Sequence, residues 1–195
     1  MYIDFHTHRA VPADVITPRS YGIHPWDAEG AVVPPADAEV WKAAEVIGEC
    51  GLDRLRGPSI DVQQAVFEQQ IAVAEVLDKP LVVHCVRVYD LLLAMRKRHS
   101  GGRWVVHGFQ GSVALARQLA ERQIGVSIGA RILTVGNDKV CQVAQALGSG
   151  GFLLETDDSG ASIEEIYKIT ATVLGVSLWQ LQSDIAERYA QLLVH

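Results

Sequence analysis

Imidazole and carboxylate side chains, the types that bind divalent metals, recur at the ends of short apolar runs in this sequence. Six residues share that position: His6, His8, Glu49, His84, His107 and Asp157. Such ligands suit Zn, Mn, Co or Mg better than thiophilic metals. Two such ions, bridged by one carboxylate, can activate water and neutralise charge on a phosphoryl or carbonyl oxygen. We therefore expect metal-dependent hydrolytic chemistry.

The pair His6 and His8 is the first of these features. The two residues are separated by one position in Asp-Phe-His-Thr-His. On an extended chain, the side chains of residues two positions apart point to the same side, so both imidazoles can bind one ion. Asp4 lies two positions before His6, so its side chain points to the same side of the chain. We expect it to accept a hydrogen bond from a histidine and so fix the tautomer of that ring. The alternative is a pair of hydrogen-bonded strand histidines without a metal.

Each remaining candidate also has an alternative interpretation. Glu49, flanked by Gly48, could be a surface residue at the start of a loop. His84 and His107 could be hydrogen-bonded core histidines. Of the two aspartates that follow Leu-Glu-Thr, we expect Asp157 to bind metal or take a proton and Asp158 to have no such role.

The elements that must position these residues alternate along the chain. Near-continuous apolar runs predict buried parallel strands at 2–6, 45–49, 81–84, 103–107, 124–128 and 152–155, with a weaker one at 20–23. Helices are expected at 59–77, 88–99, 113–122, 139–147 and after Ser162 and Ser177, with Ser112 and Asn137 as further caps.

This alternation predicts an α/β fold with a parallel sheet. Strands of a parallel barrel end at one face, which would bring the six candidate ligands to one rim. A complete barrel usually needs ~250 residues, so we expect a TIM-barrel-like fold that is incomplete, with about seven parallel strands. The turn after His107, Gly108-Phe-Gln-Gly111, could offer backbone N–H groups to an anion.

The composition is that of a globular protein. Of the 195 residues, 49% are hydrophobic and 21% charged, and we expect one domain over residues 1–195. The net charge of −6 argues against a broad basic face for nucleic acid. The three cysteines lack the spacing of a metal or redox motif, so we expect reduced thiols. We also expect a cytoplasmic protein, because the sequence shows no apolar run of membrane-spanning length and no signal-peptide core. We expect the tryptophans at 26, 41, 104 and 179 to pack in the core or on helices rather than form a stacking platform.

Six ordered motifs resemble the TatD family of metal-dependent hydrolases, within the amidohydrolase-like barrel superfamily. The matching stretches are Asp4-Phe-His-Thr-His8, Gly22-Ile-His-Pro25, Gly48-Glu-Cys-Gly-Leu-Asp53, Pro80-Leu-Val-Val-His84, His107-Gly-Phe-Gln-Gly111 and Leu154-Glu-Thr-Asp157. The resemblance implies that His6, His8 and Asp157 bind a first metal. It also implies that Glu49 bridges to a second metal and that Asp157 acts as the general base.

The resemblance implies further roles on the side of the second metal and the substrate. His84 and His107 match ligands of the second metal. His24 matches a histidine near the substrate phosphate, and Asp53 matches a residue at the rim of the site. Family members usually carry a basic residue two places after the fourth-motif histidine, and we expect Arg87, three places after it, to replace that residue.

The chain differs from the family on the substrate side. The segment between the first two motifs is short, and the proline-containing loop that usually follows the last motif is absent. The family is described as metal-dependent deoxyribonucleases, so DNA is the first candidate substrate. A small phosphate ester, lactone or amide is the alternative, and a non-catalytic metal-binding protein is a third hypothesis. No membrane partner is expected, and the sequence leaves monomer and dimer open.

Overall fold

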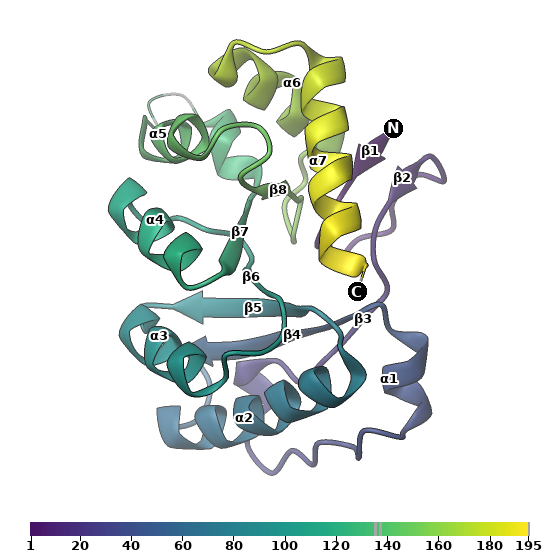
Figure 1. Ribbon diagram of the computed structural model, residues 1–195, viewed down its shortest axis with the longest axis vertical. Coiled ribbons are helices and arrows are strands. Elements are labelled where there is room, and N and C mark those ends of the chain that lie inside the picture. The colour runs from purple at the N-terminus through teal and green to yellow at the C-terminus, as the bar shows by residue number, and fades with distance from the viewer. Residues whose placement is uncertain (135, 137, 195) are drawn as a thin grey trace. The chain divides into compact units, whose positions relative to one another are not determined.

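The computed structural model describes residues 1–134, 136 and 138–194, in which short strands alternate with helices (Figure 1). The strands are β1 (Tyr2–Ile3), β2 (Val15–Ile16), β3 (Ser20–Tyr21), β4 (Val46–Asp53), β5 (Leu81–Val86), β6 (Trp104–Val106), β7 (Ile124–Ile128) and β8 (Leu153–Leu154). The α-helices are α1 (Glu39–Ala43), α2 (Ile60–Leu77), α3 (Tyr89–Arg98), α4 (Val113–Glu121), α5 (Asp138–Leu147), α6 (Ile163–Leu174) and α7 (Leu178–Leu193). Two 3₁₀ turns, η1 (Pro25–Asp27) and η2 (Ala130–Leu133), complete the set.

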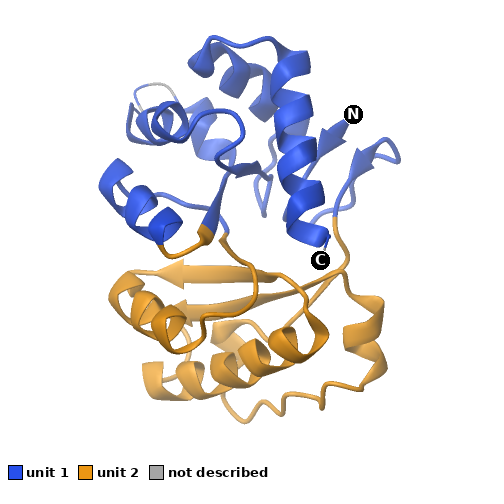
Figure 2. Ribbon diagram, in the orientation of Figure 1, with its two compact units in different colours: residues 1–17, 107–121, 125–194 blue, residues 18–106, 122–124, 195 orange. Residues whose placement is uncertain are grey.

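These elements form two compact units, coloured separately in Figure 2. Unit 1 contains residues 1–17, 107–121 and 125–194, and unit 2 contains residues 18–106 and 122–124. The expectation of one domain over residues 1–195 stays a prediction.

Unit 2 is built on the parallel strands β3, β4, β5 and β6, which are neighbours in that order. Strand β4 is the longest, and seven of its eight residues are buried because apolar side chains occupy both of its faces. Helix α2 packs against β4, and α3 packs against β5. This packing places the carboxyl ends of β4 and β5 side by side, with Gly51 opposite His84 in the strand register.

Unit 1 has two parallel strand pairs. Strand β1 pairs with β2, and β7 pairs with β8. The backbone N–H of Phe5 donates to the carbonyl of Leu154 at 2.9 Å, which joins the N-terminal segment to β8. Helices α6 and α7 both pack against β1 and β8, so the chain after His6 is held beside the chain after β8.

The seven expected strands are all present, several of them shorter than expected. Strand β2 was not expected, because two residues are too few to show a strand pattern. It lies in the short segment between the first two motifs. Helix α1 was also not expected, since five residues show little helical periodicity.

The expected helix caps are confirmed in three of the four places where they can be compared. Ser59, Ser112 and Ser177 each accept a hydrogen bond from the backbone N–H three residues on. Ser162 begins α6 in extended backbone but makes no side-chain cap hydrogen bond within the described part of the chain, so the expected capping box there is wrong. The cap expected at Asn137 lies outside the described residues.

The tryptophans divide into two buried and two exposed side chains. Trp41 and Trp104 are 0% and 1% exposed, as expected for core residues. Trp26 is 42% exposed and Trp179 is 72% exposed, so the expectation of packed side chains is wrong for these two. Trp26 lies in the short turn η1, and its N–H bonds to a carboxylate instead of pointing into a core.

The cysteines are reduced and the helices are not of membrane-spanning type among the described residues. Cys50 and Cys85 are buried, and all three cysteines are free thiols, as expected. Among the described helices, none combines the length and the apolar character that a membrane crossing requires.

Candidate metal centres

A first ligand group lies in unit 1, where the chain after β1 meets the chain after β8. The backbone N–H of Asp157 donates to the carbonyl of His6 at 2.9 Å, and the N–H of His8 donates to the carbonyl of Asp157 at 3.2 Å. Thr7 and Asp157 form a parallel bridge between these hydrogen bonds. Because His6 and His8 flank the bridge, their side chains lie on one side of it, as their spacing predicts.

The side chains of these three residues converge. The Nε2 atoms of His6 and His8 lie 3.9 and 3.5 Å from Oδ1 of Asp157. Asp157 has a φ of 51°, a left-handed conformation that aspartate tolerates better than most residues. The side chain of His6 is 4% exposed and that of His8 is 55% exposed, so solvent reaches the group from the His8 side. Two imidazoles and one carboxylate are a donor set that fits a divalent cation with open coordination positions.

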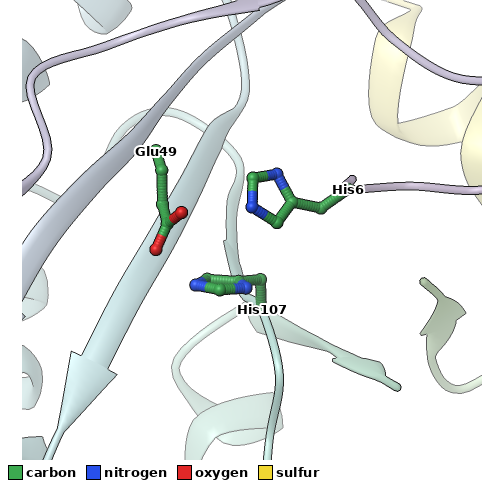
Figure 3. A group of neighbouring side chains, drawn as sticks. All are labelled: His6, Glu49 and His107. Atoms are coloured by element: carbon green, nitrogen blue, oxygen red, sulfur yellow. The ribbon is translucent and has the colours of Figure 1, made fainter. Parts of the chain in front are cut away.

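His107 adjoins this group within unit 1. Its ring centroid lies 4.6 Å from that of His6, and Figure 3 shows the two rings close together. The Nδ1 atom of His107 lies 3.5 Å from Oε1 of Glu155, which leaves Nε2 as the nitrogen that can face a metal. His107, Glu155 and Asp157 also offer ligand atoms within 4.8 Å of one another.

Glu155 is a site residue that sequence reasoning missed. It is 0% exposed and accepts hydrogen bonds from the backbone N–H of Gly108 at 2.6 Å and from the hydroxyl of Ser127. Burial opposes its ionisation, but the neighbouring His107 and His6 and these donors outweigh burial and hold its pKa below the usual value. The signal was present, because a glutamate inside an apolar strand needs buried partners.

One backbone N–H of the glycine turn after His107 is used inside the protein, and the anion-binding role expected for the rest of the turn stays a prediction. The Gly108 N–H points at the internal carboxylate of Glu155 rather than at an external anion.

Asp4 is also more specifically bound than expected. It is 1% exposed and accepts hydrogen bonds from the N–H and the hydroxyl of Thr156, at 2.9 and 2.6 Å. Burial raises the pKa of Asp4 to about 6. Its expected effect on a histidine tautomer stays a prediction.

A second ligand group lies in unit 2. Glu49 on β4 places Oε1 2.7 Å from Nδ1 of His84 and 3.1 Å from Nε2 of His24. The three side chains are 7%, 13% and 19% exposed, so they are shielded from most solvent. Their ligand atoms lie within 4.8 Å of one another. This is again a donor set of two imidazoles and one carboxylate.

His24 differs from His84 in how its ring is held. The backbone N–H of Trp26 donates to Nδ1 of His24 at 3.2 Å. A neutral imidazole that accepts at Nδ1 carries its hydrogen on Nε2, and that nitrogen then donates to Glu49. To bind a metal through Nε2, His24 would need a lone pair on Nε2 in place of this hydrogen. The local hydrogen bonds therefore favour His24 as a hydrogen-bond donor to a carboxylate or a substrate oxygen. This agrees with the place near the substrate phosphate that the family resemblance implies for it.

Asp53 positions His84. Its Oδ2 lies 3.1 Å from Nε2 of His84 and accepts from the indole N–H of Trp26 at 2.7 Å, and its Oδ1 accepts from the N–H of Leu55 at 2.8 Å. Burial opposes ionisation of Asp53, but hydrogen bonds from these donors outweigh it and hold its pKa below the usual value. With Asp53 beside Nε2, Nδ1 of His84 faces Glu49 and is the nitrogen that could bind a metal.

Several expected roles stay predictions. Asp53 is 3% exposed and bonded to protein groups, so its expected contact with substrate rests on the sequence. Arg87 is exposed just beyond β5, with a φ of 58°, and its substrate role likewise stays a prediction. The bridging role of Glu49, and the joint binding of one metal by His84 and His107, also stay predictions.

A cavity of about 210 Å³ opens beside Asp157 within unit 1. Its lining includes Gly108, Gln110, Gly129, Arg131, Thr156 and Asp157. Backbone, amide, hydroxyl and guanidinium groups thus lie around a candidate metal-binding carboxylate, as in a substrate pocket.

Comparison with known proteins agrees with this geometry. A family model described as TatD related DNase matches residues 13–168. The chain is 34% identical over 113 residues to the Escherichia coli protein YjjV, described as an uncharacterized metal-dependent hydrolase, covering 57% of this chain and 44% of the relative. It is 30% identical over 146 residues to the 3'-5' ssDNA/RNA exonuclease TatD of Klebsiella pneumoniae, covering 70% of this chain and 55% of the relative. The chain thus spans about half the length of the curated relatives it matches.

Solved structures agree on the fold. The crystal structure of YjjV, a TatD homologue from Escherichia coli, matches with a TM-score of 0.78 and 23% identity, over 91% of this chain and 76% of that one. A TatD family hydrolase from Entamoeba histolytica matches with a TM-score of 0.72 and 15% identity, over 91% of this chain and 74% of that one. The expected fold, a TIM-barrel-like α/β architecture that is incomplete, is confirmed.

Proposed function

This chain belongs to the TatD-related DNase family, and from that premise we propose that it is a divalent-metal-dependent hydrolase of phosphodiester bonds. The observation that carries the proposal is the convergence of His6, His8 and Asp157, three metal-ligating side chains from segments about 150 positions apart in the sequence. The second group, around Glu49 and His84, supports two bound ions per chain.

The residues of this chain have distinct roles in the proposed reaction. His6, His8 and Asp157 would hold one ion, and Glu49 with His84 would contribute ligands to a second. A bound divalent ion supplies Lewis acidity and a water of lowered pKa. Asp157 takes the proton of the attacking water, because its carboxylate is 35% exposed and faces the open His8 side. His24 donates its Nε2–H to a substrate oxygen, and Asp53 holds His84 in place.

The substrate class follows from the relatives and the chemistry. The Klebsiella relative is named as a 3'-5' exonuclease of single-stranded DNA and RNA, and we propose the same bond type for this chain. Divalent ions offset the net charge of −6 at the point where an anionic phosphodiester binds.

Metal reconstitution tests the proposal. The full chain is stripped of metal, reloaded with Mn²⁺, Mg²⁺, Co²⁺ or Zn²⁺, and assayed for nucleotide release from single-stranded DNA. We expect turnover with at least one ion and a loss of several orders of magnitude in Asp157→Asn. Asp14→Asn is the matched control, since Asp14 is an exposed carboxylate in the same unit. Turnover no higher than that of Asp157→Asn with every ion would refute phosphodiester hydrolysis.

The size of the unit 1 cavity favours a second candidate, a small phosphate ester. Its volume of about 210 Å³ lies below the range of roughly 300–1,000 Å³ that is usual for ligand pockets. A panel of chromogenic phosphate, lactone and amide substrates separates the two candidates. Metal-dependent activity on small esters, without release of nucleotides from DNA, would select the small-substrate function.

A further inference from the structure

An exposed indole borders the ligand group of unit 2. Trp26 is 42% exposed, and its ring centroid lies 4.6 Å from the ring of His24 and 5.9 Å from that of His84. Both imidazoles approach at a steep angle, with interplanar angles of 80° and 77°. An apolar π surface therefore reaches from solvent to the edge of a candidate metal centre.

A cation shares this surface. The guanidinium carbon of Arg56 lies 4.6 Å from the centroid of the Trp26 ring, in a cation–π contact. Arg56 is exposed, so its guanidinium remains accessible to a ligand. An aromatic face combined with an arginine is the pairing with which proteins bind the bases and backbone of single-stranded nucleic acid.

One carboxylate fixes both partners. Asp53 accepts the indole N–H of Trp26 through Oδ2 at 2.7 Å, and the backbone N–H of Arg56 through Oδ1 at 3.2 Å. Since Oδ2 of Asp53 is also 3.1 Å from His84, the indole and the metal-facing imidazole are held by the same group. The distance from the aromatic surface to the reaction site is therefore set by one residue.

Hydrogen bonds from a buried glutamine hold the loop that carries Arg56. Gln63 is 1% exposed, and its Nε2 donates to the carbonyls of Asp53, Arg56 and Pro58 at 2.9, 3.0 and 2.8 Å. Gly57 packs so closely that an added Cβ would lie 2.9 Å from the Cα of Trp26. The surface is thus preorganised, and little conformational entropy is lost when a ligand binds it.

A purely structural role does not account for the whole side chain. The hydrogen bond to Asp53 needs an N–H donor, which a glutamine or histidine can also supply. An indole that is 42% exposed serves that hydrogen bond no better than these smaller side chains would. Arg56 lies over the indole ring, and the part of Trp26 that stays exposed beyond this contact is the part without a structural explanation.

We propose that Trp26 and Arg56 form a subsite for a nucleobase, in which a planar base stacks on the indole and Arg56 contacts the adjoining phosphate. The inference rests on the proposed function, because it names the substrate as a nucleotide at the end of a single strand. Bases within a duplex are already stacked on both faces, so a single-stranded end fits this surface.

Calorimetric titration tests the subsite without catalysis. The full chain carrying Asp157→Asn is titrated with thymidine 5'-monophosphate, with a short oligothymidylate and with ribose 5-phosphate, which lacks a base. We expect both nucleotide probes to bind more tightly than ribose 5-phosphate, and the oligonucleotide to bind at least as tightly as the monophosphate. Equal binding of ribose 5-phosphate and the nucleotides would overturn the proposal.

Two substitutions separate stacking from structure. Trp26→Gln keeps a donor for Asp53 but removes the ring, and we expect roughly five- to hundred-fold weaker nucleotide binding. Trp26→Phe keeps a ring without the donor and should retain most of that affinity. Trp179→Gln, which changes another exposed tryptophan on α7, is the control and should change nothing. Nucleotide affinity that falls in Trp26→Phe but not in Trp26→Gln would show that the N–H matters and the ring does not, which would overturn the stacking proposal.

Arg56→Gln provides a variant with little effect on folding, because its side chain is exposed. We expect it to weaken binding of thymidine monophosphate more than binding of thymidine, and equal losses would contradict a phosphate contact. Nucleotide binding without any turnover in the reloaded wild-type chain would refute the hydrolase but not the subsite. Turnover of DNA with unchanged affinity in Trp26→Gln would refute the subsite alone.

Discussion

Oδ2 of Asp53 lies 3.1 Å from Nε2 of His84. This contact orients the imidazole, because a carboxylate beside one ring nitrogen favours the hydrogen on that nitrogen and turns the other toward a metal site. The other nitrogen, Nδ1, then faces Glu49 at 2.7 Å. A residue that the sequence placed at the rim of the site is therefore part of the support of a candidate metal ligand.

Replacing Asp53 by asparagine is expected to weaken the metal site of unit 2. The neutral amide is a poorer acceptor for His84, so we expect roughly ten- to hundred-fold lower metal affinity. Titration of the metal-free full chain with Zn²⁺ or Mn²⁺ measures this change. Asp90→Asn is the control, because Asp90 is an exposed carboxylate of the same unit that pairs with Arg54 at 3.5 Å. Identical metal affinities in both variants would contradict the positioning role.

Replacing Glu155 by glutamine is expected to destabilise unit 1. A glutamine amide keeps one acceptor oxygen where Glu155 uses two, so its N–H₂ would face either the Gly108 N–H or the Ser127 hydroxyl and weaken this buried network, at a cost of about 1–3 kcal/mol. Ser127→Ala removes one donor and keeps the carboxylate, so its loss should be smaller. Chemical denaturation gives both free energies of unfolding. A larger loss in Ser127→Ala than in Glu155→Gln would count against the buried carboxylate as the centre of this network.

A methyl group at Gly51 is expected to be severely destabilising. Gly51 has a φ of 128°, and an added Cβ would lie 2.2 Å from the carbonyl oxygen of His84. We expect Gly51→Ala to cost about 3 kcal/mol or more, or to prevent folding. Gly150→Ala is the matched control, since its Cβ would have no heavy atom within 4 Å among the described residues. Thermal unfolding compares the two, and similar melting temperatures would contradict the close strand approach.

Alkaline pH is expected to destabilise the protein partly through Tyr167. This side chain is 0% exposed, and its hydroxyl donates to the carbonyl of Ile3 at 3.2 Å. Burial raises the pKa of Tyr167 above its usual value, so the folded state keeps the proton after the unfolded state has lost it. Its contribution to stability is full below the unfolded pKa of ~10 and declines as the pH rises above it.

The Tyr167→Phe variant tests this dependence. Its free energy of unfolding should fall less steeply above pH 10, by about 1.4 kcal/mol per pH unit for one group. The slope that remains in the variant has a contribution from the half-buried phenol of Tyr89, whose pKa burial also raises. Parallel stability curves for the variant and the wild type between pH 9 and 11 would contradict the assignment to Tyr167.

Much of the fold could be predicted from local patterns. Apolar runs identified the main strands, and the serines before α2, α4 and α7 identified helix starts, because a buried parallel strand and a capped helix each have a local signature. Strand β2 and helix α1 were missed, since two and five residues carry too little periodicity. Ser162 matched the capping motif but makes no cap bond within the described residues, because the motif states a preference and not a geometry.

The sequence by itself determined which ligand-type side chains this protein has, and the spacing of His6 and His8 determined that they share a side of the chain. The family resemblance already joined Asp157 to the histidine pair, whereas only the tertiary structure decided that Glu155 lies beside His107 and Asp53 beside His84. It also decided that Trp26 faces solvent. The physical reason is that side-chain direction within one element follows from backbone geometry, whereas hydrogen-bond partners, burial and histidine tautomers depend on the packing of segments that are far apart in the sequence.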